Sequence, residues 1–374
     1  MHRHTQLEEI TRKEKPELLP ERWPPLPQVQ RILAKKLGLL LSTRPTDPSE
    51  SHPPRAASNG FYFLTGTSEG KEIFIRAAFN QRQRRCAASA SFLVAHEGRI
   101  LSSIVTHPNI EQYCTHNNRG PFYYLATELV KGMQLSKLLK ENEYQEKFSL
   151  QSRLLLAKGI ASGLDHLHTQ HKIVHRDISP GNIMIDRLLA QQQPEHAGVI
   201  IDFEYAIELE GQKTLHRYIA LSSYSPDEVL WEAFLSSSPK KGQKKDLLSR
   251  IDDKNRVERL SQRPQVINSF TNDKIAFVHL FVHILTGHHP YAHRNTDTIL
   301  PRSTPINSNA SNAAKLLLKR GSFNPEGLPS NVEGKIRIAI INPSSIGSLV
   351  NFVQEITSLY EIEQQKKLLQ LIAS

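Results

Sequence analysis

The chain has 374 residues, 39% of them hydrophobic, which is enough for a normal globular core in one large or two ordinary domains. Only Cys86 and Cys114 are present, so a disulfide scaffold is excluded and a reducing compartment is favoured. The formal net charge of +10 favours either acidic partners or general solubility. Because no basic motif is interleaved with aromatic residues, no specific nucleic-acid binding is predicted.

Neither a signal peptide nor a membrane span is expected. The first residues, Met1–Thr5, lack the apolar core of a signal peptide. The most apolar run, Ile275–Leu285, is too short to cross a membrane and contains two histidines. We therefore expect no classical secretion, no transmembrane segment, and a location in the cytoplasm or the nucleus.

Residues 1–55 form a lead segment with prolines distributed along it, so we expect it to be irregular and partly disordered. Within it, the apolar spacing of Val29–Leu41 predicts one short amphipathic helix. That helix would dock either on the following domain or on a partner.

From Gly60 onwards the pattern becomes that of strands. Phe61–Leu64 and Glu72–Ile75 flank a turn and predict a hairpin. A helix is predicted over Ala88–Ile104, and a further strand over Phe122–Ala126. Residues 56–130 are therefore predicted to form a small, mostly β unit with one helix.

Residues 131–374 are mainly helical in pattern. Leu150–His168 has apolar residues at helical spacing, and Asp273–Leu285 is apolar all round, which predicts a buried helix that ends at Gly287. Ile346–Leu371 predicts one or two closing helices. No internal repeat is evident.

Two loops in this helical region carry the residues that suggest chemistry. Val174–Asn182 contains Asp177 and, five positions later, Asn182, and Ile200–Glu204 contains Asp202 after a short apolar strand. Transfer of a phosphoryl group needs a residue that positions the attacking hydroxyl, and hard oxygen ligands for magnesium. These three side chains can supply both, whereas the bland alternative is three solvated loop residues.

The pattern H-R-D-x-x-x-x-N followed by D-F-x resembles the catalytic and metal-binding loops of protein kinases. The variant H-R-D-I-S-P-G-N is closest to the fungal-type protein kinase-like family. This resemblance extends over residues 58–300 and implies an α+β, bilobal protein kinase-like fold. The fold has a small β-rich N-lobe with one helix and a larger, mainly helical C-lobe.

The resemblance implies a function that uses ATP and Mg2+ on a protein substrate with a Ser or Thr hydroxyl. Asp177 and Asn182 would be catalytic, with Asp177 receiving or orienting the hydroxyl proton, and Asn182 and Asp202 would bind the metal. The nucleotide would be contacted by Arg76, Glu97, Gly60, Glu128, Val130 and Ser179.

The family also implies framework residues. Asp273 would accept hydrogen bonds from the backbone of the catalytic loop, and Glu228 would brace the activation segment. Arg176 would pair with a phosphate on that segment, whose candidate hydroxyls are Thr214, Tyr218, Ser222 and Ser223.

Departures from the family pattern concentrate at the nucleotide. Arg76 replaces the usual lysine, and Phe74 replaces a small residue beside the adenine. The glycine-rich loop is reduced to Gly60, and Glu204 replaces the glycine of D-F-G. A pseudokinase that acts as a binding or scaffold module is therefore the main alternative. A small-molecule phosphotransferase of the aminoglycoside or choline kinase type is a third.

Two groups of side chains remain outside this scheme. Lys240, Lys241, Lys244 and Lys245 lie in a basic insertion near residues 232–270, which is either a solvated loop or a site for an acidic partner. Four histidines lie close together in sequence: His166, His168, His171 and His175. They have no cysteine or acidic companion at the spacing of metal ligands.

Overall fold

The structure is a computed structural model. It describes residues 26–37, 40–41, 55–56, 61–68, 70–79, 90–141, 144–209, 224–235, 241–249, 251, 260, 269–293, 317, 320–323 and 328–373. The chain divides into two compact units. Unit 1 comprises Met1–Gly98 and Cys114–Leu129, and unit 2 comprises Arg99–Tyr113 and Val130–Ser374.

Unit 1 is built on a six-stranded sheet of order β1-β3-β4-β6-β5, in which β2 also pairs with β3. Strands β3 (Phe61–Ser68) and β4 (Lys71–Phe79) form the hairpin predicted from the sequence. Gly70 in its turn has a φ of 81°, a conformation that glycine adopts without strain. The other strands are β1 (Leu40–Leu41), β2 (Arg55–Ala56), β5 (Tyr113–Asn117) and β6 (Phe122–Glu128).

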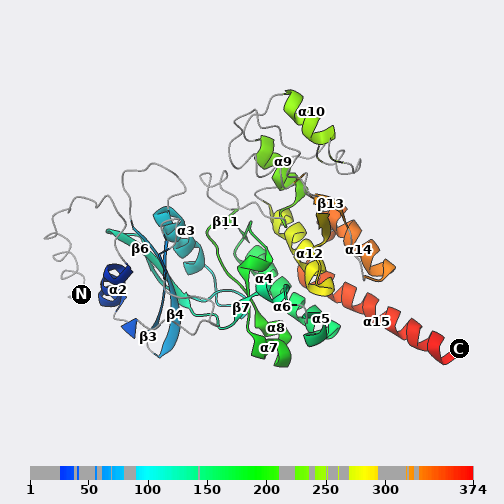
Figure 1. Cartoon of the computed structure of the whole chain (residues 1–374), viewed down its shortest axis with the longest axis horizontal. Coiled ribbons are helices and arrows are strands. Elements are labelled where there is room, and N and C mark those ends of the chain that lie inside the picture. The colour runs from blue at the N-terminus through cyan, green and yellow to red at the C-terminus, as the bar shows by residue number, and fades with distance from the viewer. Residues whose placement is uncertain are drawn as a thin grey trace. The chain divides into compact units, whose positions relative to one another are not determined.

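One face of this sheet forms the core of unit 1. Because side chains alternate along a strand, every second residue of β3, β4 and β6 points to the same side. Helix α2 (Leu26–Leu37) covers that side and inserts Val29 and Leu33, both fully buried (Figure 1). The sheet residues that they join are Tyr62, Leu64, Ile73, Ile75, Ala77, Phe122, Tyr124 and Ala126.

The amphipathic helix expected in the lead segment therefore exists and docks on the sheet of its own unit. Its end differs from the prediction, because Leu40–Leu41 leaves the helix and pairs with β3 at Gly66 and Thr67 as strand β1. Two leucines fit a strand edge as well as a helix face, so local sequence alone does not separate the two.

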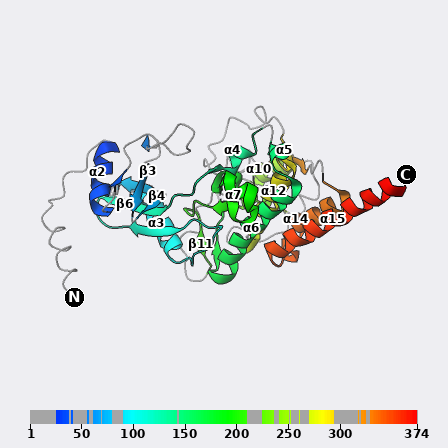
Figure 2. The ribbon, with the colours of Figure 1, turned by 90° about the horizontal axis from the view of Figure 1, so that it is seen from below.

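Unit 2 is mainly helical, and its longest helices lie side by side along it (Figure 2). Helix α6 (Leu150–Gln170) begins at Ser149, whose hydroxyl accepts a hydrogen bond from the Ser152 backbone N–H. The other described helices are α4 (Leu135–Leu138), α5 (Tyr144–Lys147), α7 (Arg187–Gln192), α8 (Pro194–Ala197), α9 (Asp227–Leu235), α10 (Lys241–Ser249), α12 (Phe270–Thr286), α14 (Ser330–Ile341) and α15 (Leu349–Ala373).

Helix α12 is the buried, nearly all-apolar helix that the sequence predicts. It ends at Gly287, whose φ of 72° and N–H bond to the His283 carbonyl form a left-handed cap. Helix α15 is a single closing helix, and its first turn is capped by Asp165 of α6, which accepts hydrogen bonds from Ser348, Leu349 and Val350.

Short strands complete unit 2. Strands β9 (Ile183–Ile185) and β10 (Gly198–Ile200) pair antiparallel, and β7 (Met133–Gln134) lies on the other side of β9. Strand β8 (Ile173–Val174) pairs with β11 (Ile207–Glu208), and β12 (Tyr291–His293) pairs with β13 (Arg320–Phe323). A β-sheet N-lobe and a helical C-lobe confirm the predicted α+β fold. Helix α3 (Ala90–Ser102) is the predicted helix of the N-lobe region.

The contact between α2 and the sheet gives a test of the lead segment. Replacing Leu33 by alanine removes a fully buried side chain, so we expect the free energy of unfolding to fall by roughly 2–5 kcal/mol. Replacing the exposed Lys35 on the same helix should change it by no more than about 0.5 kcal/mol. Denaturant titration measures both, and equal effects would contradict the docking.

Candidate active site

The loop between β8 and β9 brings Asp177 and Asn182 together. Pro180 opens a single 3-10 turn, Pro180–Asn182, because its fixed φ suits the first helical position. In that turn the Asn182 N–H donates to the Ser179 carbonyl at 3.0 Å. The Asn182 side-chain amide donates to the Asp177 carbonyl oxygen at 2.9 Å and to its carboxylate Oδ2 at 2.7 Å.

Asp202 lies close to Asp177 and Asn182 but on a different segment of the chain. It lies two residues after the end of β10. The residue between them, Ile201, donates its N–H to the Asn182 carbonyl at 3.0 Å. Asp202 has a φ of 68°, a left-handed conformation that costs a non-glycine residue about 1–3 kcal/mol and persists only where neighbours fix it. The three residues predicted from the sequence to act together are therefore neighbours in unit 2.

Burial and charge combine at Asp177. Burial raises the pKa of Asp177 to about 7, the Asp202 carboxylate adds to the shift, and the hydrogen bond from Asn182 opposes it. Two carboxyl groups and an amide group therefore lie close together, and carboxylate and amide oxygens are the ligands that magnesium prefers. The residues fit a magnesium ion that Asn182 and Asp202 would hold. No arrangement of three or more His, Cys, Asp or Glu suited to a metal occurs among the described residues, so the fit depends on the asparagine.

A buried carboxylate supports the loop that carries Asp177. Asp273, fully buried on α12, accepts the backbone N–H groups of His175 at 2.7 Å and Arg176 at 2.8 Å. His168 of α6 donates to the same carboxylate at 2.9 Å. Burial alone would raise the pKa of Asp273, but the hydrogen bond and charge of His168 hold it below its usual value. The expected role of Asp273 is confirmed, whereas His168 as its partner was not anticipated.

His175 has a structural role. Its ring packs on Phe203 with centroids 4.8 Å apart, Nδ1 accepts the Asp177 N–H at 3.3 Å, and Nε2 donates to the Ile201 carbonyl at 3.1 Å. Burial lowers the pKa of His175, which suits a neutral ring with one donor and one acceptor. It thereby ties the Asp177 loop to the segment that carries Asp202.

Arg176 is buried and has a φ of 66°. Its Nε donates to the Tyr205 carbonyl at 2.6 Å, which fixes the chain just beyond Asp202. The hydroxyls that we expected to carry a phosphate for Arg176, at positions 214, 218, 222 and 223, lie outside the described residues. The phosphate pairing of Arg176 stays a prediction.

In unit 1, Arg76 pairs with Glu97. Arg76 Nη1 lies 2.9 Å from Glu97 Oε2, and their side chains are 12% and 3% exposed. The guanidinium carbon also lies 4.3 Å from the centre of the Phe61 ring, a cation–π contact that lysine would make less well. The arginine is thus held from two directions, by the carboxylate of Glu97 and by the ring of Phe61.

The same sheet face carries a row of aromatic rings. Phe63 stacks on Phe61 and on Phe74, with centroids 6.2 and 5.9 Å apart. Phe74 thus lies beside Arg76, on the face opposite α2. The row places large rings where the family resemblance implies a small residue.

Of the other residues expected at the nucleotide, the structure describes three. Glu128 at the end of β6 forms an ion pair with Lys71, and Val130 is half-buried just after that strand. Ser179 caps the 3-10 turn before Asn182. Gly60 lies outside the described residues.

Sequence reasoning missed Asn109. Its side-chain amide, buried in unit 2, donates to the carbonyls of Glu195 and Gly198, both at 2.8 Å. Its own carbonyl accepts the Ile200 N–H at 2.9 Å, and the Ile200 carbonyl accepts the Glu111 N–H at 2.9 Å. The sequence gives no signal for these bonds, because Glu195 and Gly198 lie 86 and 89 positions away along the chain.

Comparison with known proteins agrees with this geometry. A model of the protein kinase domain matches residues 65–250. The chain belongs to the protein kinase superfamily. Its relatives include the serine/threonine-protein kinase/endoribonuclease ire-1 of Caenorhabditis elegans, 31% identical over 163 residues, and the serine/threonine-protein kinase/endoribonuclease IRE2 of Homo sapiens, 35% identical over 130 residues. The dual specificity protein kinase shkD of Dictyostelium discoideum is 30% identical over 124 residues.

These matches are partial. They cover 43%, 34% and 32% of this kinase but only 15%, 12% and 16% of the three relatives. The superfamily is thus established over the catalytic region, whereas the activities of the longer relatives are statements about those proteins. Within the described part of the chain, no helix has the length and apolar character that crossing a membrane requires.

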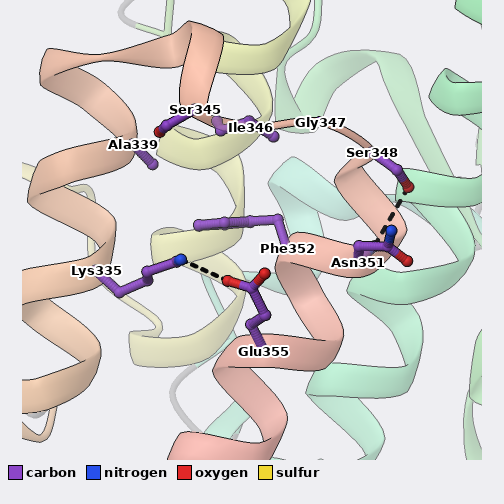
Figure 3. A pocket seen from close by; sticks show the side chains of 9 residues that line it. All are labelled: Lys335, Ala339, Ser345, Ile346, Gly347, Ser348, Asn351, Phe352 and Glu355. Atoms are coloured by element: carbon purple, nitrogen blue, oxygen red, sulfur yellow. Dashed lines mark hydrogen bonds and ion pairs between the residues drawn. The ribbon is translucent and has the colours of Figure 1, made fainter.

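A pocket of about 160 Å³ lies elsewhere in unit 2, between α14 and α15 (Figure 3). Phe352 and Ile346 line it, and Lys335 and Glu355 form an ion pair across it. None of the predicted catalytic residues lines this pocket, so it is separate from the candidate active site.

The brace from α12 gives a test of the site's framework. An asparagine at position 273 would turn an N–H toward a backbone donor and leave His168 without its carboxylate. We expect Asp273→Asn to lower the free energy of unfolding by roughly 3–5 kcal/mol, as for a broken buried pair. Asp246→Asn on the exposed face of α10 is the matched control and should have almost no effect in the same denaturant titration.

Proposed function

We propose that this kinase is an active, ATP- and magnesium-dependent phosphotransferase that acts on Ser or Thr hydroxyls of proteins. The observation that carries the proposal is the hydrogen-bonded pair of Asp177 and Asn182 with Asp202 beside it. These side chains supply the hydroxyl-positioning carboxylate and the oxygen ligands that phosphoryl transfer needs.

In the proposed mechanism Asp177 accepts or orients the proton of the attacking hydroxyl, so that its oxygen lies in line with the phosphorus. The Asn182 amide keeps the carboxylate in one orientation through its bond to Oδ2. Bound magnesium supplies charge neutralisation at the phosphoryl oxygens. Asn182 and Asp202 would hold that ion, and Ser179 would lie close to the transferred group.

For the nucleotide, we propose contacts from Arg76, Glu128, Val130 and the backbone at Gly60. Glu97 would act by holding Arg76 through the buried ion pair.

Because two relatives are named serine/threonine kinases and a third is named a dual specificity kinase, the acceptor hydroxyl has to be identified directly. Exposed Lys244 and Lys245 on α10 would suit an acidic partner.

The test is transfer of labelled γ-phosphate to a mixed library of Ser, Thr and Tyr peptides. Asp177→Ala and Asp202→Ala should each lower kcat by at least about 100-fold, in line with loss of a positioned proton acceptor or metal ligand. Asp246→Ala on α10 is the control and should retain full activity. Equal activity in all four proteins would reject the proposed mechanism, and label on tyrosine alone would reject the Ser/Thr assignment.

A specific observation favours a second candidate, a pseudokinase that binds partners without catalysis. Phe74 stacks on Phe63 in a row that continues to Phe61, and Arg76 already contacts both Phe61 and Glu97. Such a row would obstruct a nucleotide if it filled the space where the base binds.

A thermal-shift titration with ATP and magnesium separates the two candidates. A ligand that binds only the native state stabilises it by about 2.7 kcal/mol at 100 times its Kd, so an active kinase should show a raised Tm. For the pseudokinase the Tm stays constant, and Phe74→Ala should then create a shift by opening the space.

A further inference from the structure

Three histidine rings in unit 2 lie in contact, and the active site uses none of them. His107 lies in the segment after α3, His166 lies on α6, and His171 follows that helix. The ring centres of His107 and His166 are 4.8 Å apart, and those of His166 and His171 are 5.0 Å apart. We name these three residues the histidine clasp.

Two rings of the clasp hold the backbone of Val105. The Val105 N–H donates to His171 Nε2 at 3.1 Å, and the Val105 carbonyl accepts from His166 Nε2 at 3.2 Å. A backbone N–H can only donate, so His171 Nε2 carries no proton. A carbonyl can only accept, so His166 Nε2 does carry one.

The third ring holds the next part of the segment in the same way. The Asn109 N–H donates to His107 Nδ1 at 3.2 Å, and His107 Nε2 lies 3.3 Å from the Ser162 hydroxyl of α6. A fully protonated imidazole has no acceptor nitrogen. The bonds to Val105 and Asn109 therefore require His171 and His107 to be neutral.

The held segment continues directly to the strand that carries Asp202. Asn109 and Glu111 bond on either side of Ile200, and the Asn109 amide holds Gly198 at the start of β10. Gly163 of α6 makes room for this contact, since a Cβ there would lie 3.0 Å from the Asn109 carbonyl. β10 is thus paired with β9 on one side and with residues 109–111 on the other.

We infer that the histidine clasp is a positioning device that holds residues 105–111 against β10 and so fixes Asp202, and that acidification opens it. Its effect on catalysis rests on the proposed function, whereas the opening itself does not. The clasp residues are positioning residues, because none of them touches the candidate catalytic side chains.

The surroundings favour neutral rings. Burial lowers the pKa of His107, and the charges of His166 and of His196 from α8 lower it further. Burial lowers the pKa of His171, with a further contribution from His166. Among the charged groups close in sequence, Asp165 is bonded to the first turn of α15, Arg99 pairs with Glu208, and Lys172, next to His171, is exposed to solvent.

The direction of the pH effect follows from these shifts. A histidine released from the clasp has an ordinary pKa of about 6.5, whereas burial holds the pKa of His107 and of His171 below that value in the clasp. The open form therefore binds more protons as the pH falls below about 6.5, and the clasp loses stability there. Above that pH both forms are neutral and the clasp stays closed.

The first test is amide hydrogen exchange of residues 105–111 in the full chain at pH 7.5 and 5.5, corrected for the intrinsic rates. We expect opening to increase by up to about tenfold for each neutral ring, because an open-form histidine with a pKa of about 6.5 is roughly ten-to-one protonated at pH 5.5. Equal protection at both pH values would overturn the inference.

A variant that cannot titrate sharpens this test. His107→Asn together with His171→Gln retains an oxygen acceptor near each lost nitrogen but cannot become protonated. We expect this variant to protect residues 105–111 equally at both pH values, whereas His288→Gln, at an exposed histidine after α12, should respond as wild type does. A wild-type response in the double variant would refute the clasp. If circular dichroism shows that it fails to fold, His171→Gln alone should reduce the response at Val105.

Phosphate transfer gives the functional readout. The ratio of kcat at pH 6.0 to kcat at pH 7.5 should be higher in the double variant than in wild type. If Asp177→Ala shows that the proposed chemistry is absent, the exchange data still decide the inference, because they monitor no catalysis. A pH-dependent opening with an unchanged kcat ratio would refute the link to Asp202.

Discussion

The carboxylate of Asp273 is the contact on which the active-site loop depends. It is fully buried and accepts two consecutive backbone N–H groups, from His175 and Arg176, together with the His168 ring. Two adjacent N–H groups that point at one carboxylate restrict the φ and ψ of His175, and the bond from Arg176 Nε to the Tyr205 carbonyl holds the next residue, whose φ is positive. The chain can then turn directly into Asp177. A carboxylate on a buried helix thus holds the backbone directly before Asp177, the proposed catalytic carboxylate.

The second constraint is the double support of the strand before Asp202. β9 bonds to one side of β10, and residues 109–111 bond to the other. A two-stranded pairing alone is only marginally stable, and a third segment restricts its twist and register. Since Asn182 directly precedes β9, the pairing of β9 with β10 also sets the separation of Asn182 from Asp202. The two residues proposed to bind the metal, which lie on two loops, are in this way placed by one small sheet.

The sequence predicts best what depends on near neighbours along the chain. The five-residue spacing of Asp177 and Asn182, the hairpin around Gly70 and the cap at Gly287 all follow from local geometry, and each is present. The carboxylate that His168 meets lies 105 positions away along the chain. The sheet residues on which α2 docks lie roughly 30 or more positions away. A histidine beside other histidines gives no sign of which carboxylate it will meet, so the sequence assigns these histidines no role where the structure has a brace and a clasp.

The departures at Arg76 and Phe74 are consistent with each other. A guanidinium is planar and weakly hydrated, so it can lie on the Phe61 ring while its Nη1 meets Glu97. The stacked phenylalanines supply that surface, and a lysine would gain less from it. An arginine held in two directions has less freedom to follow a phosphate than a lysine on a flexible stem. The charge at this position therefore contributes first to the structure of unit 1, and any phosphoryl transfer depends more heavily on the oxygen ligands of unit 2.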